Sequence, residues 1–170
     1  MRATRREALR RRYLSLGLGE LAAASVFLTI ALTMALPRLD HGQDRLALWS
    51  ALVPLLFVLV QAGAYWLMAR SWVERHPMPA PVRAGYRAFR IANIALLGGG
   101  LAGVIVWLPD GVAAGVAVVA VWLFGVIEFV NYYVVRLSYP ARRWLSTVGQ
   151  RRTPRLVRDM NAAARPPSTS

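Results

Sequence analysis

The chain has 170 residues, of which 56% are hydrophobic, and its mean hydropathy is +0.41. A soluble domain of this size is usually ~45–50% apolar, and the excess here is clustered into long runs, which indicates an integral membrane protein. The 21 basic residues are all arginine and leave a net charge of +13, and the lack of cysteine excludes disulfide exchange, thiolate metal sites and cysteine nucleophiles.

Four apolar segments follow one another along the chain and predict four transmembrane helices. Each is close to the ~20 residues that a helix needs to cross the hydrocarbon core of a bilayer. No stretch alternates between apolar and polar residues over ~10 positions, so transmembrane β-strands are not expected. The predicted fold class is therefore all-α, an integral membrane four-helix bundle within residues 1–140, with spans at about 14–36, 46–68, 91–108 and 112–135.

The first apolar segment follows a basic start, as the core of a signal peptide would. Its apolar part is long, Glu20 interrupts its beginning, and no small-residue A-x-A site follows it. These features predict that the segment is an uncleaved span.

The placement of arginine predicts the orientation of the spans. Nineteen of the 21 arginines lie in the N-terminal tail, the second loop and the C-terminal part, whereas only Arg38 and Arg45 lie in the first loop. Because arginine is concentrated on the cytoplasmic side of membrane proteins, both termini are predicted to be cytoplasmic. The absence of lysine favours a GC-rich coding sequence, and the predicted localisation is the bacterial cytoplasmic membrane.

The C-terminal part divides into two predicted segments. Residues 141–158 mix aromatic and aliphatic side chains with arginines, which favours a basic amphipathic helix on the surface of the inner leaflet; a solvated basic tail is the alternative. Residues 159–170 are predicted to be disordered. Anionic phospholipids are the expected partner and nucleic acid is not; the predicted headgroup-binding residues are Arg12, Arg90, Arg136, Arg142, Arg143, Arg151 and Arg152.

Proline and glycine shape the connections between the spans. Pro77, Pro79 and Pro81 predict an extended backbone in the second loop. Residues 82–90 are predicted to form a short surface helix that leads into the third span. The connection between the third and fourth spans, Pro109 to Gly111, is so short that it requires an antiparallel hairpin.

Glycines at a spacing of four predict close helix packing in the second half of the chain. Gly99 and Gly103 form a G-x-x-x-G in the third span, and Gly111 and Gly115 repeat that spacing where the fourth begins. Such glycines let two helix backbones approach each other within lipid. Packing of the third span on the fourth is favoured, because the hairpin already brings them together, and a homodimer seam is the alternative.

Polar side chains recur at one depth in three of the spans. Glu20 follows Arg12 by eight residues and Glu128 precedes Arg136 by eight, which is about 12 Å of helix in each case. Gln61 lies at a similar depth in the second span. The predicted polar layer consists of Glu20, Gln61, Asn131, Glu128 and Tyr132.

The neighbours of these residues indicate that the polar layer points into the bundle. Gly17, Ala24 and Ala31 share the helical face of Glu20, and small residues on one face are typical of a packed interface between membrane helices. On the fourth span, Asn131 and Tyr132 fall with Glu128 within a stripe of about 100°.

Three functions are compatible with this layer. Two carboxylates in one low-dielectric layer repel each other unless a proton or a cation is shared between them. The favoured interpretation is a structural, accessory or lipid-interacting membrane protein in which the layer holds the helices in register. The alternative is a small proton- or cation-coupled transporter that uses Glu20 and Glu128. A protein partner or a homo-oligomer stays open.

Catalytic motifs are absent from the sequence, which contains no Gly-rich phosphate loop, G-x-S-x-G or H-E-x-x-H. The chain is therefore predicted not to be an enzyme and to need no cofactor. His41 and His76 are the only histidines and lie in loops on opposite predicted sides, so no metal site is expected. Asp40, His41 and Asp44 could form a small acid–base or metal cluster, but a polar turn that offsets nearby arginines is favoured.

The stretch LGLGELAAAS, Leu16 to Ser25, resembles the first helix of the small multidrug resistance transporters, which have four short spans and a glutamate in the first. The resemblance is in line with the transport alternative and covers this helix alone. The basic loop from Arg70 to Arg90, the longer ends of the chain and the second glutamate, Glu128, depart from that family's pattern. We therefore do not assign the chain to it.

Overall fold

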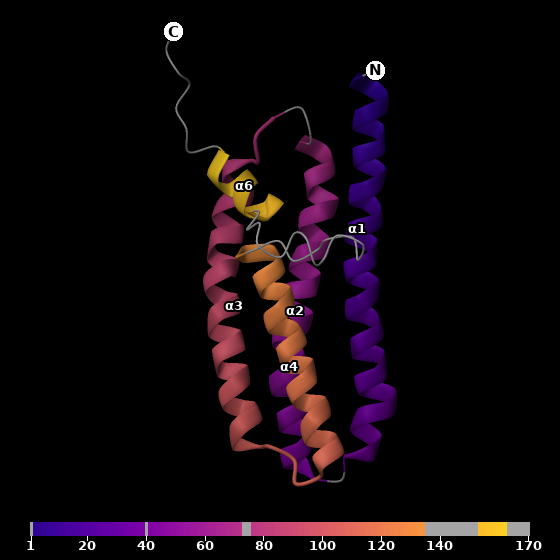
Figure 1. The fold of residues 1–170 in the computed structure, drawn as a ribbon, viewed down its shortest axis with the longest axis vertical. Coiled ribbons are helices and arrows are strands. Elements are labelled where there is room, and N and C mark those ends of the chain that lie inside the picture. Colours follow the sequence, from indigo (N-terminus) through magenta and orange to yellow (C-terminus); the bar gives the residue numbers. More distant parts are fainter. Residues whose placement is uncertain (1, 40, 73–75, 135–152, 163–170) are drawn as a thin grey trace, which may run out of the picture.

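The protein is a bundle of long helices (Figure 1). The computed structural model describes residues 2–39, 41–72, 76–134 and 153–162. These residues contain helices and no strand, and four of the helices are long and apolar enough to cross a membrane. The predicted all-α bundle of four candidate spans is thus confirmed.

The first span is helix α1, Arg2–Ile30, which continues into a π-helical turn at Ala31–Ala35 and a 3₁₀ turn at Leu36–Arg38. Proline in the first turn of a helix is tolerated, but further along it removes a backbone hydrogen-bond donor. Pro37 therefore fits at the start of the 3₁₀ turn and ends the regular α-helical pattern before it. The second helix begins at Gly42.

Helices α2, α3 and α4 complete the bundle, at Gly42–Trp72, Ala80–Val106 and Val112–Tyr133. Pro79 is extended, and Pro81 lies in the first turn of α3, where its missing N–H costs no hydrogen bond. The separate surface helix predicted at residues 82–90 is therefore wrong, because these residues form the first turns of α3 without a break. The extended backbone predicted around Pro81 is likewise replaced by helix.

Helix α2 is the central element of the bundle. It packs against α1, α3 and α4, whereas α3 and α4 touch each other less extensively. Ala47, Ala51, Leu55 and Tyr65 are fully buried on it. All four long helices keep large apolar side chains exposed on their outer faces, as lipid-facing surfaces do.

The contact between α1 and α2 is closest at two facing glycines. A Cβ added at Gly17 would lie 3.0 Å from the carbonyl oxygen of Gly63, and a Cβ added at Gly63 would lie 3.1 Å from that of Gly17. Ala24 and Ala31, further along the same face of α1, are 7% and 4% exposed. The small-residue face predicted from Gly17, Ala24 and Ala31 is therefore buried in the structure.

The glycines of α3 pack on α2, and the predicted packing of the third span on the fourth through them is wrong. Pro54 of α2 has no N–H, so the carbonyl of Ser50 loses its usual partner within the helix. Gly100 approaches at this point, and a Cβ added there would lie 2.5 Å from the Ser50 oxygen. Gly99, the first glycine of the predicted G-x-x-x-G, has open space around it.

A further helix, α6, covers Arg155–Ala162 and lies across the end of α4 (Figure 1). It contacts α3 and α4. Residues 159–162, predicted as the start of a disordered tail, belong to this helix. Residues 135–152 and 163–170 lie outside the described part of the chain.

The adjacent glycines of α3 provide a matched test of this packing. Gly100→Ala should lower the free energy of unfolding in detergent by about 1–3 kcal/mol, because the added methyl overpacks the contact with Ser50. Gly99→Ala adds the same atom into open space and should leave stability unchanged or raise it through helix propensity. Equal effects of the two substitutions would contradict the packing of α3 on α2 through Gly100.

Candidate functional site

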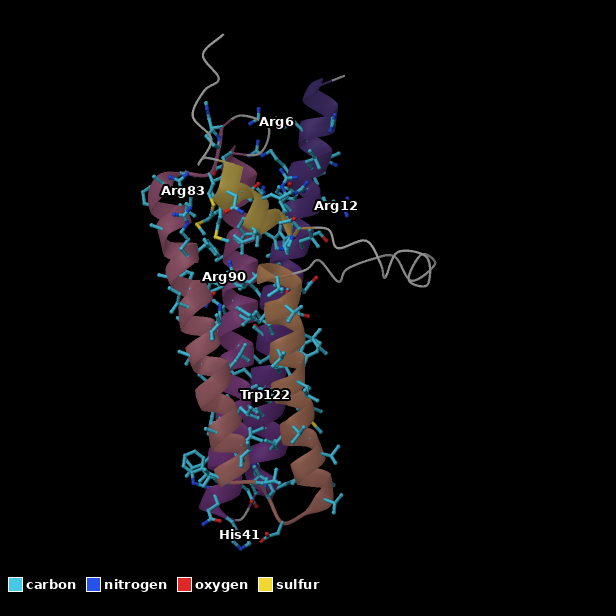
Figure 2. All side chains as sticks on the ribbon, turned by 60° about the vertical axis from the view of Figure 1, so that its left-hand side comes forward. Arg6, Arg12, His41, Arg83, Arg90 and Trp122 are labelled. Atoms are coloured by element: carbon cyan, nitrogen blue, oxygen red, sulfur yellow. The ribbon has the colours of Figure 1, made fainter. Side chains whose placement is uncertain are left out.

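Polar side chains gather inside the bundle at one end, where α1 and α3 begin and α2 and α4 end. Most of the described arginines lie at the same end, as Arg6, Arg12, Arg83 and Arg90 show in Figure 2, whereas His41 marks the opposite end together with Arg38 and Arg45. We call the end that contains Arg6, Arg12, Arg83 and Arg90 the arginine-rich end. Two hydrogen-bonded clusters lie within it, and both involve α2 and α4.

The first cluster is built on Gln61 of α2. Its side-chain oxygen accepts a hydrogen bond from Asn93 Nδ2 on α3, at 2.8 Å, and another from the Tyr133 hydroxyl on α4, at 2.9 Å. Its backbone oxygen accepts a third from the Tyr86 hydroxyl on α3, at 2.9 Å. Gln61 thus connects three helices at a point where it is only 5% exposed and Asn93 is fully buried.

In the Gln61 cluster, each of the two side-chain amides has one bonded atom, namely Gln61 Oε1 and Asn93 Nδ2. Gln61 Nε2 and Asn93 Oδ1 have no partner among the described residues. An unsatisfied buried amide atom costs free energy, so these two atoms offset part of the stabilisation that the three hydrogen bonds supply.

The second cluster connects α1 to α4 and α2 through Glu20. The Tyr132 hydroxyl donates a hydrogen bond to Glu20 Oε1 and accepts one from Trp66 Nε1, at 3.2 Å. Glu20 is half-buried and Tyr132 is buried. One tyrosine therefore joins three helices here, as Gln61 does in the first cluster.

Glu128 and Asn131 complete the polar layer on α4. The Asn131 side chain hydrogen-bonds to Glu128, one helical turn away, and the two carboxylates of Glu20 and Glu128 are close enough to interact electrostatically. The structure therefore brings Glu20, Glu128, Asn131 and Tyr132 together at the side of α4 that faces α1. Gln61 is joined to different residues, in the cluster described above.

Sequence reasoning missed the part of α3 in these clusters. Tyr86, Asn93 and Gly100 are buried and recur at intervals of seven residues, with Leu97 and Val104 buried between and beyond them. This is the spacing of a helix face that packs continuously against a neighbour. The same pattern in the sequence would have placed Asn93 inside the bundle.

Helix α6 covers the arginine-rich end of the bundle with its apolar side turned inward. Leu156 and Met160 are 2% and 3% exposed and belong to a core cluster that includes Tyr13, Tyr65 and Tyr132. The basic surface helix predicted at residues 141–158 stays a prediction, because most of it lies outside the described residues; in the described part, Leu156 packs against protein. Asp159 accepts a hydrogen bond from the Tyr65 hydroxyl at 2.7 Å, which ties α6 to α2.

The predicted headgroup arginines fall into two groups. Arg12 and Arg90 are described and exposed at the arginine-rich end. Five more lie outside the described residues, namely Arg136, Arg142, Arg143, Arg151 and Arg152. Among the described residues, no group of three or more His, Asp or Glu side chains could hold a metal ion.

Comparisons with known proteins leave the family open. No protein-family model, curated protein or solved structure matches the chain. The resemblance to small multidrug resistance transporters is thus limited to Leu16 to Ser25.

Two tyrosines allow the second cluster to be tested by removal of a single oxygen atom. Tyr132→Phe leaves the half-buried Glu20 and the Trp66 ring nitrogen without this partner and should lower the free energy of unfolding by about 1–2 kcal/mol. Tyr13→Phe is the control, because the Tyr13 hydroxyl is buried and has no partner among the described residues. It should leave stability unchanged or raise it in the same detergent melt, because it removes a buried hydroxyl without a partner. Equal melting of Tyr132→Phe and wild type would contradict a structural role for the Glu20 cluster.

Proposed function

We propose that this chain is a multi-pass protein of the bacterial cytoplasmic membrane whose arginine-rich end faces the cytoplasm and binds anionic phospholipid headgroups. In this proposal the protein has no catalytic reaction of its own, and its polar layer has a structural role. The observation that carries the proposal is the coincidence of two features. The end at which polar side chains of four helices bond to one another is also the end at which most of the described arginines gather.

Helix lengths support the placement of this end among lipid headgroups. The 22 residues of α4 span about 33 Å, close to the ~30 Å thickness of a hydrocarbon core. Helices α1, α2 and α3 have 29, 31 and 27 residues, or about 40–46 Å, and so extend beyond α4. With α4 as the measure of the membrane, Tyr132 and its partners lie near the inner boundary of the hydrocarbon, and Arg12 lies about 12 Å further out.

The partners of the two glutamates favour a structural role over transport. Glu20 bonds to Tyr132 and Glu128 to Asn131, so each carboxylate is engaged by a neighbour within the bundle. The transport alternative rests on the electrostatic contact between Glu20 and Glu128. It predicts substrate flux in proteoliposomes that Glu20→Gln and Glu128→Gln abolish.

The orientation can be tested with single cysteines, because the chain contains none. His41 and His76 are exposed and lie beyond opposite ends of α2. With a membrane-impermeant maleimide, His41→Cys should react in intact spheroplasts, whereas His76→Cys should react only after lysis. The reverse pattern would place the arginine-rich end outside the cell and overturn the proposed orientation.

Lipid binding can be tested on the purified full chain in a neutral detergent. Added phosphatidylglycerol should raise the melting midpoint more than phosphatidylcholine does, because arginines at the headgroup level attract the net negative charge. High salt should reduce the difference, since exposed charges are screened. Equal stabilisation by the two lipids, with no dependence on salt, would contradict the proposed function.

A further inference from the structure

A small cavity at the arginine-rich end lies between α1, α2 and α6. Its volume is about 90 Å³, and three arginines line it, Arg12 from α1 with Arg155 and Arg158 from α6. One water molecule needs roughly 10–15 Å³ measured in this way, so the cavity has room for a larger polar group.

The charge of the cavity is strongly positive. No acidic residue lines it. Asp159, the nearest acid on α6, lies 3.9 Å from Arg155 and already accepts a hydrogen bond from Tyr65. Three guanidinium groups around one small space repel one another, so an anion between them would lower the free energy of this arrangement.

The Tyr13 hydroxyl is a second and independent feature of the cavity. Tyr13 lines it, is 3% exposed, and has no hydrogen-bond partner for its hydroxyl among the described residues. A buried hydroxyl without a partner is costly, and an acceptor in the cavity would satisfy it. The Arg155 guanidinium lies 5.2 Å from the centre of the Tyr13 ring, which holds the two side chains together at this site.

The apolar part of the lining indicates what kind of anion fits. Leu16 and Trp66 line the cavity together with the arginines. Tyr13 precedes Glu20 by seven residues, or about 10 Å of helix, which places the cavity just outside the polar layer. An anion held here would have arginines on one side and an apolar bundle surface on the other. A phosphodiester that carries acyl chains matches both surroundings.

We propose that this cavity binds the phosphate group of one anionic phospholipid, through Arg12, Arg155, Arg158 and the Tyr13 hydroxyl. The inference rests on the proposed function, because it requires that this end of the bundle lies at the headgroup level. The lipid bridges α1 and α6, so its binding stabilises α6 in its position on the bundle.

Native mass spectrometry of the full chain with phosphatidylglycerol tests the site. Wild type should retain one lipid more tightly than all others. Arg12→Gln and Arg158→Gln should each weaken that lipid about tenfold, the factor expected for one charge-assisted hydrogen bond. Both side chains are exposed, so the variants should keep the fold.

The double variant Arg11→Gln, Arg87→Gln is the matched control. It removes two positive charges, as the double variant of Arg12→Gln and Arg158→Gln does. Arg11 and Arg87 are exposed at the same end of the bundle and do not line the cavity. It should keep the tightly bound lipid. Tyr13→Phe should weaken that lipid without lowering the melting midpoint of the lipid-free protein.

The outcomes separate the cavity from the general proposal. Selective phosphatidylglycerol binding by wild type that the cavity variants leave unchanged would overturn the cavity and keep the proposed function. Loss of any preference for phosphatidylglycerol over phosphatidylcholine in wild type would overturn both. Inorganic phosphate at millimolar concentration is the third arm. If it displaces the tight lipid and stabilises the protein as much as phosphatidylglycerol does, the cavity binds free phosphate and the lipid is overturned as its occupant.

Discussion

Inside a bilayer a polar side chain has no water to bond to, so its hydrogen-bond partners must come from the protein. This constraint acts most strongly on Gln61, which lies on the central helix and is almost fully buried. The Gln61 side-chain oxygen is satisfied because α3 brings Asn93 to it and α4 brings Tyr133. The relative positions of three helices are thereby fixed at one point. Gly63, two residues further along α2 and therefore on its other side, holds α1 through the close contact with Gly17.

The arginine-rich end differs from the rest of the bundle in its chemistry. Below it, the helices present apolar side chains to lipid and small residues to one another. At this end, tyrosine hydroxyls and the ring N–H of Trp66 bond across helices, and α6 packs on the aromatic cluster. Aromatic side chains with one polar atom suit a level at which hydrocarbon gives way to headgroups. The proposed lipid site lies at this level, between α1 and α6.

Much of this architecture could be predicted from the sequence. Apolar runs of sufficient length identify four spans, because a helix must present apolar side chains over the whole hydrocarbon thickness. The buried face of α1 could also be predicted from the sequence, because small residues recur on the face that contains Glu20. Glycine spacing correctly indicated close packing in α3 but gave the wrong partner helix. Spacing identifies a face that can approach another helix, and it carries no information about which helix that is.

The role of α6 could not be read from its sequence for a related reason. A helix with one apolar side and one basic side can bury its apolar side in lipid or in protein. Both cases require the same amino-acid composition, so the sequence does not distinguish them. Leu156 and Met160 are buried because the short α4 leaves the aromatic residues of the longer helices uncovered at this end. This uncovered aromatic surface forms only when the helices have packed together. Asn93 was missed, although its spacing of seven residues from Tyr86 and from Gly100 places it on one face of α3.

The central claim, that Gln61 holds the helices together through its hydrogen bonds, is tested most directly by a double-mutant cycle. The free energy of unfolding in detergent would be measured for Gln61→Met, Tyr133→Phe and the double variant. The account predicts that each single substitution destabilises and that the double loses less than their sum, with a coupling of about 0.5–1.5 kcal/mol. Additive effects, or single variants as stable as wild type, would contradict it.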